Sequence, residues 1–519
     1  MAKEYRPEDR EQAFLLPPDM RDWLPADHLA WFVLDTIARL DCRALDAPSR
    51  RGGVGREGYD PRMLLGLWIY ASARGICSSR QIERACSEDV AFRVLCAQDV
   101  PDHTVLARFR QRHQDAMADL FGQVLALCVR AGMGRFGMVA IDGTKIAANA
   151  SISRSVTLAR LRKLAEAELA KAAQQDAAED AAGAPGAHDD VPPAFTGSGR
   201  GARIDAAIAD LQRQIEDENK AELAARAEAL AVARRRRVRA EADARERVRV
   251  YQQSPLGRRP MGRPPVAVPV AVRRARGVEA VAARALARSE RRQAEQIAGA
   301  PTRERRLGVR NTTDAQSRIM RTRQGFVQGY NAQLAVTDDH LIAVAVATNC
   351  PSDAGQFVPM MRRCEQVVDE LVKRAGGRGD LRIGVITADA GYLSEEAVTA
   401  AGPARLIAPG QGRARAGEGW TGTVPRPGSA ATKAMMAAFD NEANKRLYKR
   451  RGATVETVNA HVKDGRGLRR FARRGLDAVQ AELLLAALST NLVRLFGRIG
   501  PRAKTWAWPR GPLACQPGR

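Results

Sequence analysis

Three acidic residues stand where a carboxylate could do chemistry. Asp142 follows the apolar run 138–141, which predicts a buried strand with Asp142 at its end. Asp389 follows a second run of apolar and β-branched residues at 382–387, and Glu456 lies in a segment whose valines have helical spacing. Because strand ends in an α/β sheet present functional side chains rigidly, Asp142 and Asp389 could share one site. Taken singly, each acid is better explained by a structural role such as a surface salt bridge.

Other acidic residues compete with these three. Asp338 and Asp339 fall in a predicted hairpin turn, where Asp is favoured by turn chemistry. Glu395 and Glu396 fall in the first turn of a predicted helix, where the helix dipole favours negative charge. Asp353 is a further rival, and none of these acids is included in the candidate site.

The elements that must position the acids alternate strands with helices. Strands are predicted at 329–336 and 341–348 with a polar turn between them, and a further strand at 406–408. A helix is predicted from Ser394, and another from Thr454. This alternation predicts an α/β layer.

Residues 1 to about 135 are predicted to be all-helical. The last helix there opens after Pro101 and carries Arg108, Arg110 and Arg112 on a partly basic face. Short helices followed by an arginine-bearing helix suit a helix-turn-helix-like DNA reader. An ordinary helical bundle with a solvated arginine face fits the pattern equally well.

A long segment, roughly 155–310, interrupts the predicted sheet. The 4-3-4 spacing of Ile204, Ile208, Leu211 and Ile215 predicts a long helix that forms half of a coiled-coil hairpin. Residues 177–203 are rich in Ala, Gly, Pro and Asp, and are predicted to be a flexible connection.

The charge of the chain predicts a polyanionic partner. The 519 residues include 83 Lys and Arg against 59 Asp and Glu, which gives a net charge of +24. Residues 231–310 alone hold 22 Arg and 7 acidic residues. Within them, Arg263 lies in an Arg/Pro-rich stretch at 257–265, which fits either a hook for the minor groove of DNA or, as we favour, a basic linker that contacts phosphates only.

The composition argues against several other classes of protein. The longest apolar stretch, 481–488, is far shorter than a membrane-spanning helix and contains Glu482, and the first residues lack the apolar core of a signal peptide. The eight cysteines form no CxxC pair, and the six histidines show no metal-ligand spacing. We therefore expect a cytoplasmic protein with free thiols and no structural zinc.

Taken together, the acidic motifs match a specific pattern. The chain resembles the DDE transposases of bacterial insertion sequences across most of its length. The resemblance rests on Ile141–Lys145, on Thr387–Tyr392, on Tyr448, Arg451, Glu456 and Lys463, on blocks at 311–318 and 329–333, and on the helical stretch 59–113.

This resemblance implies a ribonuclease-H-like catalytic core and a helical N-terminal DNA-binding domain. It implies that Asp142, Asp389 and Glu456 bind two Mg²⁺ or Mn²⁺ ions, since three converging carboxylates repel one another without cations and hard oxygen ligands select these metals. Lys463 joins this catalytic set. Together with Tyr448 and Arg451, for which Arg450 is an alternative, Lys463 would hold the DNA end by its phosphates.

The implied function is metal-dependent cleavage at the ends of an insertion sequence and strand transfer into target DNA. The expected segments are 1–135 (DNA-binding), 136–154 (first part of the core), 155–310 (helical, arginine-rich insertion), 311–500 (remainder of the core) and 501–519 (tail). We expect a homodimer on double-stranded DNA, at terminal inverted repeats and at the target, and association with the nucleoid when bound. The alternatives are a catalytically inactive DNA-binding protein derived from a transposase and a metal-dependent nuclease without strand transfer.

Overall fold

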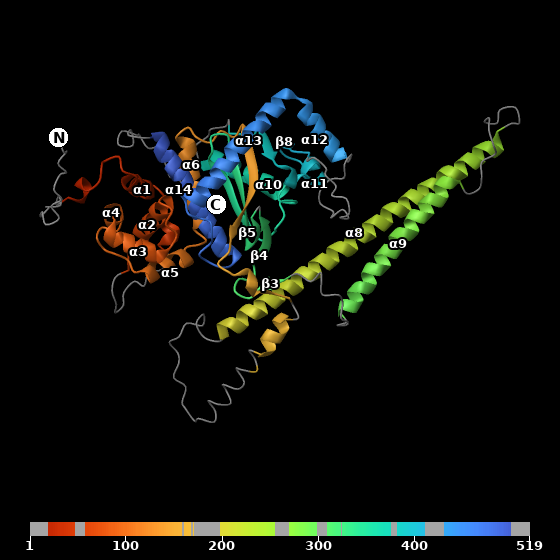
Figure 1. Cartoon of the computed structure of the whole chain (residues 1–519). Coiled ribbons are helices and arrows are strands. Elements are labelled where there is room, and N and C mark those ends of the chain that lie inside the picture. Colours follow the sequence, from red (N-terminus) through yellow and green to blue (C-terminus); the bar gives the residue numbers. More distant parts are fainter. Residues whose placement is uncertain are drawn as a thin grey trace, which may run out of the picture. The chain divides into compact units, whose positions relative to one another are not determined.

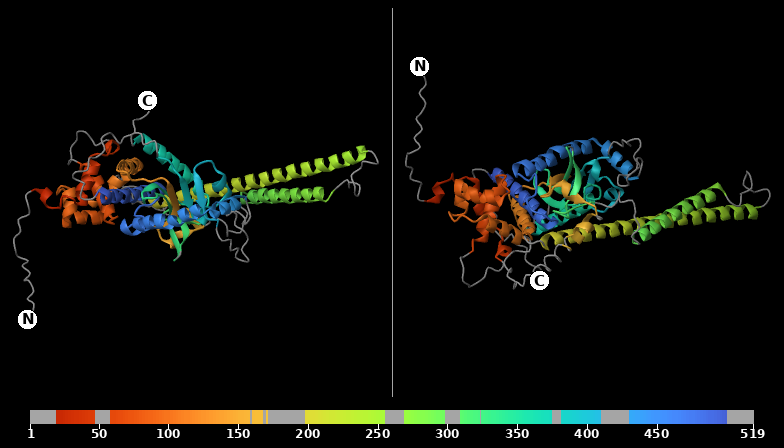
Figure 2. Two further views of the ribbon diagram at one scale, coloured as in Figure 1. Left: turned by 90° about the horizontal axis from the view of Figure 1, so that it is seen from above. Right: turned by 60° about the horizontal axis from the view of Figure 1, so that its bottom comes forward.

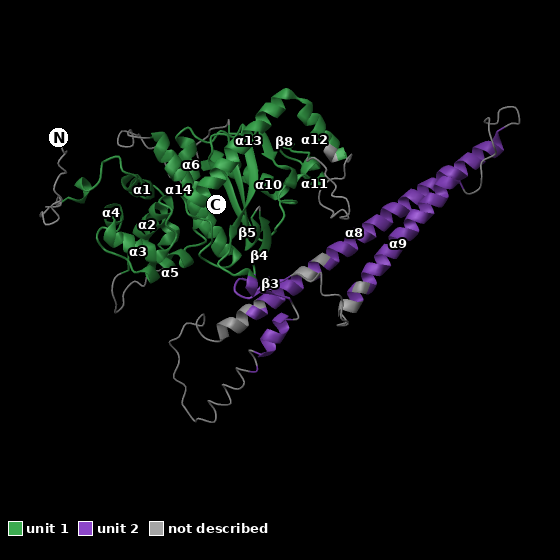
Figure 3. Cartoon of the chain, viewed as in Figure 1, with its two compact units in different colours: residues 1–152, 316–519 green, residues 153–315 purple. Residues whose placement is uncertain are grey.

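The computed structural model describes most of the chain, traced by colour in Figures 1 and 2. The described residues are 19–46, 58–157, 160–167, 170, 198–254, 269–297, 309–322, 324–374, 381–409 and 430–499. The chain divides into two compact units, residues 1–152 with 316–519 and residues 153–315 (Figure 3). The predicted tail, Arg263 with its Arg/Pro-rich stretch, and most of the predicted connection 177–203 lie outside the described residues.

The N-terminal part of the first unit is helical, as predicted. Its elements are η1 (Met20–Asp22), α1 (Leu29–Ile37), η2 (Arg43–Leu45), α2 (Pro61–Ala73), α3 (Ser79–Glu88), α4 (Val90–Leu95), α5 (His103–Arg112) and α6 (Met117–Arg130). Local capping explains where two of these helices begin. The side chain of Asp60 accepts a bond from the Arg62 amide and Pro61 opens α2, while the side chain of Asp102 caps α5 at the Thr104 amide.

A six-stranded mixed sheet forms the centre of this unit. Its strands are β1 (Met138–Ala147), β4 (Arg318–Thr322), β5 (Gly325–Thr337), β6 (Ile342–Thr348), β7 (Val385–Ala388) and β8 (Ala404–Ile407). The order is β4-β5-β1-β7-β8, with β6 also paired to β5. β5 runs antiparallel to β1, β4 and β6, whereas β7 runs parallel to β1 and β8. The predicted α/β layer is confirmed, and β4 is a strand that the sequence pattern did not predict.

The first strand is longer than predicted. The sequence pattern ended it at Ile141 with Asp142 just beyond, but the ladder with β5 continues from Val139 to Ala147, so Asp142 lies inside the strand. The prediction was wrong because it followed an apolar run. Here polar side chains of a central strand are held by hydrogen bonds to other side chains, which hydropathy does not detect.

Helices pack around the sheet. They are α10 (Phe357–Arg374), the short η6 (Ala390–Tyr392), α11 (Glu395–Thr399), α12 (Ala430–Asp440), α13 (Glu442–Ala460), the π-helical turn η7 (His461–Gly465) and α14 (Leu476–Ile499). α13 contacts β1, β5 and β7. It begins at Glu442, capped by the Asn441 side chain, rather than near Thr454 as predicted. Its first turns carry mostly polar residues, so the apolar periodicity could not reveal them.

α14 is long and apolar enough to cross a membrane by length and composition alone. It lies instead in the core of the first unit, with 78% of its most apolar window buried, and it packs on α2, α6 and β6. The core helix of a soluble protein meets the same length and composition test, so α14 is weak evidence for a membrane span.

The second unit is built on two helices, α8 (Ser198–Gln253) and α9 (Val270–Ile297), which lie side by side in Figures 1 and 2. Ion pairs join them, including one of 2.9 Å between Arg276 and Glu241. The predicted helical hairpin is confirmed, although α8 already begins at Ser198, inside the predicted flexible connection.

The residues that suggested this hairpin have a different role. Ile204 is buried, with Ile208 against the same small cluster, on Leu161 of the helical segment 160–167 and not on α9. The side chain of Ile215 lies outside the described residues. Two short antiparallel strands, β2 (Ser155–Val156) and β3 (Arg310–Asn311), pair with each other near the two ends of this unit's sequence.

Candidate active site

Asp142 is held at the centre of the sheet by two side chains of α13. Its Oδ1 accepts a bond of 3.2 Å from Arg451 Nη2, and its Oδ2 accepts one of 2.9 Å from Asn459 Nδ2. The Asp142 side chain is 18% exposed, so one edge of the carboxylate reaches solvent. The sequence pattern did not single out Asn459, since its neighbours Val455, Val458 and Val462 dominated that helix.

Asp389 follows β7 directly, as predicted, and β7 is the parallel neighbour of β1. Its Oδ1 caps η6 by accepting a bond of 2.9 Å from the Gly391 amide. Its Oδ2 lies 4.0 Å from Arg451 Nη2. One guanidinium nitrogen therefore contacts both Asp142 and Asp389, so the structure brings these two predicted carboxylates together.

A third carboxylate, Asp353, lies beside this pair. Its Oδ1 accepts bonds from Lys145 Nζ at 3.0 Å, Asn331 Nδ2 at 2.8 Å and Gln333 Nε2 at 2.8 Å. Asp353 was left out of the candidate site, yet the signal that identified Asp389 applies to it. Asp353 follows β6, which is antiparallel to β5 as β1 is, so β6 and β1 point the same way.

The close surroundings of position 143 explain why a glycine follows Asp142. A Cβ built on Gly143 would collide with Asp353 Oδ1 and with Gln333 Nε2. These polar groups belong to a network in which the buried Tyr392 hydroxyl donates to Gln333 Oε1. Only a residue without a side chain lets Asp353 and its partners approach β1 this closely.

The remaining predicted residues of α13 and η7 occupy different positions around the pair. Glu456 is exposed on α13, and Lys463 is half-buried on the π-helical turn. The Tyr448 hydroxyl donates to the carbonyl of Ala388, at the end of β7, over 3.2 Å. Arg450, the alternative to Arg451, pairs instead with Asp338 in the β5–β6 turn.

The ligand oxygens of Asp142, Asp389 and Glu456 do not all lie within 4.8 Å of one another. Among the described residues, the group that meets this distance is Glu83, Asp102 and His103 in the N-terminal helices. There, Asp102 already caps α5 and His103 Nδ1 contacts Glu83 at 3.0 Å, so these groups have structural partners.

The surroundings of Asp142 favour its neutral form. Burial raises the pKa of Asp142 to about 6, Arg451 opposes this rise, and the negative charges of Asp389 and Asp353 add to it. The pKa is higher in the folded chain than the ordinary value of 3.8, so the folded state binds this proton more tightly than the unfolded state. The stabilisation from this proton is complete below about pH 4 and is lost as the pH rises through 6.

We therefore expect Asp142→Asn to stabilise the metal-free protein at pH 8. The rise in the pKa of Asp142 on folding corresponds to at most about 3 kcal/mol in the free energy of unfolding, because each pKa unit is worth about 1.4 kcal/mol. Thermal unfolding in EDTA should show a higher midpoint for Asp142→Asn than for the wild type at pH 8. The gain should fall to about half at pH 5 and vanish below about pH 4. A lower midpoint for the variant at pH 8 would contradict this account.

A basic groove opens beside Asp142. It has a volume of about 930 Å³, and its cations are Lys145, Arg321, Lys463 and Arg469. Asp142, Thr144 and Asn459 also line it. Burial lowers the pKa of Lys463. The groove thus brings a carboxylate and several cations within the reach of one extended polyanion.

The two arginines predicted on α5 differ in their surroundings. Arg108 is exposed. Arg110 instead lies over the ring of Trp68, with its guanidinium carbon 4.3 Å from the ring centroid, and pairs with the buried Glu482 at 3.3 Å. Arg110 therefore has a structural role, contrary to its predicted contact with DNA, and only Arg108 of the two presents its charge to solvent.

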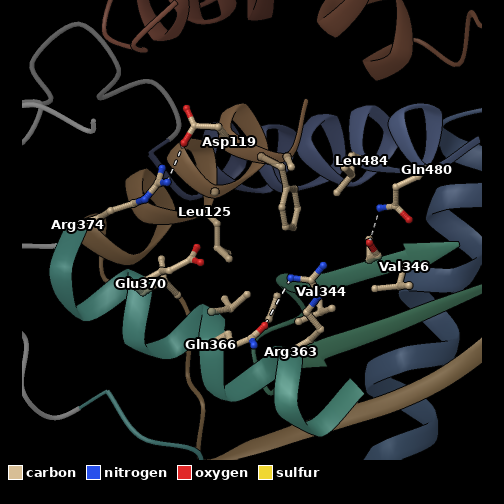
Figure 4. Close-up of a pocket in the computed structure, with 17 residues that line it drawn as sticks. Asp119, Leu125, Val344, Val346, Arg363, Gln366, Glu370, Arg374, Gln480 and Leu484 are labelled. Atoms are coloured by element: carbon tan, nitrogen blue, oxygen red, sulfur yellow. Dashed lines mark hydrogen bonds and ion pairs between the residues drawn. The ribbon is translucent and has the colours of Figure 1, made fainter. Parts of the chain in front are cut away.

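A second cavity, of about 420 Å³, lies between α6, α10, β6 and α14 (Figure 4). Apolar side chains such as Leu125, Val344 and Leu484 form much of its lining. In Figure 4 its rim residues Arg374 and Asp119 form an ion pair of 2.7 Å. It contains none of the predicted site residues.

Two segments of the chain match models of known protein families. Residues 18–112 match the Transposase domain (DUF772), and residues 416–496 match the Transposase DDE domain. The second match includes Tyr448, Arg451, Glu456 and Lys463, whereas Asp142 and Asp389 lie outside both matches. No curated protein and no solved structure matches the chain significantly.

The two matches define an enzyme of the DDE type that acts on DNA. The two matched domains thus indicate a DNA transposase. This class of enzyme depends on divalent metal ions.

Proposed function

We propose that the chain cleaves the ends of its own insertion sequence and joins the 3′-hydroxyls to target DNA, with Asp142, Asp389 and Glu456 as its metal ligands. The observation that carries the proposal is the position of Arg451 Nη2, which lies 3.2 Å from Asp142 and 4.0 Å from Asp389. A cation can therefore contact both aspartates at once. The strand order, with three antiparallel strands followed by two parallel ones, supports a ribonuclease-H-like core.

The proposed ligand residues suit Mg²⁺ or Mn²⁺, because their ligand atoms are carboxylate oxygens. Asp142 and Asp389 offer hard oxygen atoms at adjacent strands. Burial, together with the negative charge of Asp389, raises the pKa of Asp142, and a bound cation would favour its ionised form. Glu456 would approach from α13 to complete the set. When bound, two such ions would activate a water or a 3′-hydroxyl and stabilise the leaving oxygen of the phosphodiester.

The chain's own residues would bind and orient the DNA. Lys463 and Arg469 would hold backbone phosphates in the groove beside Asp142. Tyr448, whose hydroxyl is bound to the end of β7, would keep α13 in place beside Asp389. Arg451 holds Asp142 and Asp389 together, and Arg108 on α5 would contact DNA outside the groove.

The basic second unit would add affinity without sequence specificity. α8 and α9 carry many exposed arginines, which can neutralise phosphates along a duplex. The same helices leave Val238 and Val281 exposed by 56% and 60%, which makes the hairpin a candidate for the dimer contact that holding two DNA ends requires.

A reconstituted reaction tests the proposed function. The protein is incubated with labelled duplexes that carry the two ends of the element, in Mg²⁺, Mn²⁺ or EDTA, and the mass of the complex is measured by light scattering. We expect cleavage and joined products only with metal, and two protomers in each complex. Cleavage in EDTA would refute the metal site, cleavage without joined products would indicate a nuclease, and salt-dependent binding without cleavage would indicate an inactive DNA-binding protein.

A further inference from the structure

Lys145 is a cation of the basic groove whose position is set by the fold. Its side chain is 14% exposed, and its Nζ forms an ion pair of 3.0 Å with Asp353. Arg469, which lines the same groove, is 74% exposed. Because Lys145 is largely buried, its charge depends on Asp353 for compensation. The groove thus holds one positive charge at a defined point, whereas the charges on exposed side chains can move.

Lys145 reaches the groove along an edge of β1. β7 pairs with β1 at Met138–Ala140 and ends at Ala388, so it does not extend beside the later residues of β1. Asp142 and Lys145 are three residues apart and leave opposite faces of the strand, yet both line the groove that follows this edge. Three strand residues span about 10 Å, which is about three nucleotide steps of a duplex. A phosphate bound at Lys145 would therefore lie within a few nucleotides of the one at Asp142.

Asp353 is itself held in a buried frame. Its Oδ1 accepts bonds from the fully buried side chains of Asn331 and Gln333 on β5, and Asn331 is directly opposite Lys145 in the ladder. Burial raises the pKa of Tyr392, so its hydroxyl keeps its proton and donates to Gln333 Oε1. The amide nitrogen of Gln333 is then the group that faces Asp353. Three donors converge on one oxygen that offers about two lone pairs, which suits an anchor for a cation.

The chemistry of this ion pair favours a phosphate as its ligand. An ammonium group has three N–H donors, so Lys145 can keep its bond to Asp353 and donate to a phosphate oxygen as well. Lys463 and Arg469 supply further positive charge in the same groove. Because Asp353 already orders the ammonium group, little conformational freedom remains to be lost when DNA binds.

We propose that Lys145 binds a backbone phosphate of the DNA end near Asp142, and that Asp353 is the positioning residue that holds Lys145 there. This inference rests on the proposed function, in which the groove holds the DNA end. Asp353 acts through Lys145 in this scheme and does not contact the reacting atoms.

Binding without metal tests the contact with phosphate. Duplexes that carry the element's end are titrated with protein in EDTA at several salt concentrations, because each phosphate contact adds about one to the slope of log affinity against log salt. We expect Lys145→Met to lower this slope by about one and to weaken binding about 10-fold. Lys373→Met is the matched control and should leave both unchanged, because Lys373 is exposed on α10 and lies outside the residues that line the groove.

Asp353→Asn separates positioning from charge. Lys145 keeps its charge in this variant, so the salt slope should stay at the wild-type value. Cleavage in Mg²⁺ at saturating DNA should nevertheless fall about 10-fold, since the ammonium group is no longer held in place. The double variant Lys145→Met/Asp353→Asn should cleave no more slowly than Lys145→Met alone, because Asp353 acts through Lys145. It leaves no unpaired carboxylate at position 353, so its salt slope decides the question if Lys145→Met alone does not fold.

The two roles can fail separately. A wild-type salt slope in Lys145→Met, or in the double variant, would overturn the phosphate contact. Losses in cleavage rate that multiply in the double variant would overturn the positioning role and show that Asp353 acts independently of Lys145, as a metal ligand would. If the wild type cleaves no ends in any divalent metal, the proposed function fails, and the salt slopes still decide whether Lys145 binds DNA.

Discussion

Replacing Asp389 by Asn is expected to slow metal-dependent cleavage of the element ends by on the order of 10³-fold, since a metal ligand contributes several kcal/mol to the transition state. Asp389 is the best position for this test. Its side chain is 46% exposed, and its Oδ1 accepts a bond from the Gly391 amide that an Asn oxygen can also accept. The variant should therefore fold and bind DNA like the wild type, and the loss should appear in the cleavage rate alone.

Two further variants separate metal binding from structure. Asp389→Cys should be more active in Mn²⁺ than in Mg²⁺, because a thiolate is a poor ligand for the harder ion. Glu395→Gln, on the neighbouring α11, is the matched control and should leave the rate unchanged, since Glu395 is exposed and lies in the first turn of its helix. An Asp389→Asn enzyme that cleaves at the wild-type rate would remove Asp389 from the active site.

Glu456→Gln addresses the third ligand in the same assay. Glu456 is exposed on α13, whereas Asp353 already accepts three hydrogen bonds beside Asp142. A loss comparable to that of Asp389→Asn would assign the third position to Glu456. An active Glu456→Gln would point instead to Asp353, which is the other carboxylate close to the pair.

The sequence predicts the site best where local structure decides the position of a residue. Asp389 follows a short apolar strand and caps the next turn, and both features are visible in consecutive residues. Asp142 is harder, because β1 continues through polar residues whose partners come from α13 and from β5. Asp353 and Asn459 were missed for the same reason, since each is defined by contacts with residues distant in sequence.

Helix phase also limits what could be predicted on α13. Arg450 and Arg451 are adjacent, and the sequence alone did not decide which of them faces the sheet. In the structure Arg451 pairs with Asp142, whereas Arg450 pairs with Asp338 in the turn between β5 and β6. Packing of the whole of α13 against β1, β5 and β7 decides which of its side chains face the sheet. The spacing between the arginines and Glu456 in the sequence carries no information about that packing.

In the insertion, the described arginine-rich segments are helical, in agreement with the predicted helical insertion. Residues 231–253 and 270–297 are rich in Arg and are helical, and Arg has a high helix propensity. Ion pairs such as that between Arg276 and Glu241 then join the two helices. The isoleucine spacing predicted the correct motif, but Ile204 and Ile208 pack on the segment 160–167.

The pair formed by Arg110 and Glu482 links the N-terminal helices to the core of the first unit. Glu482 is 5% exposed on α14, and its Oε2 accepts a bond of 2.9 Å from the Ala472 amide. Burial raises the pKa of Glu482 and lowers that of Arg110, so each charge depends on the other for compensation. Because α5 and α14 are tied in this way, the N-terminal helices should unfold together with the sheet.

Glu482→Ala is accordingly expected to destabilise the first unit by about 3–5 kcal/mol, because it leaves the Arg110 guanidinium buried over Trp68 without an anion. The double variant Arg110→Met/Glu482→Leu should recover most of this loss, since apolar groups of similar size can replace a buried pair at little cost. Glu442→Ala, which removes an exposed partner of Lys445, is the control and should have no measurable effect. Thermal and urea unfolding of the four proteins measure these differences. If Glu482→Ala were as stable as the wild type, the pair would not hold α5 to the core, and Arg110 would again be available for DNA.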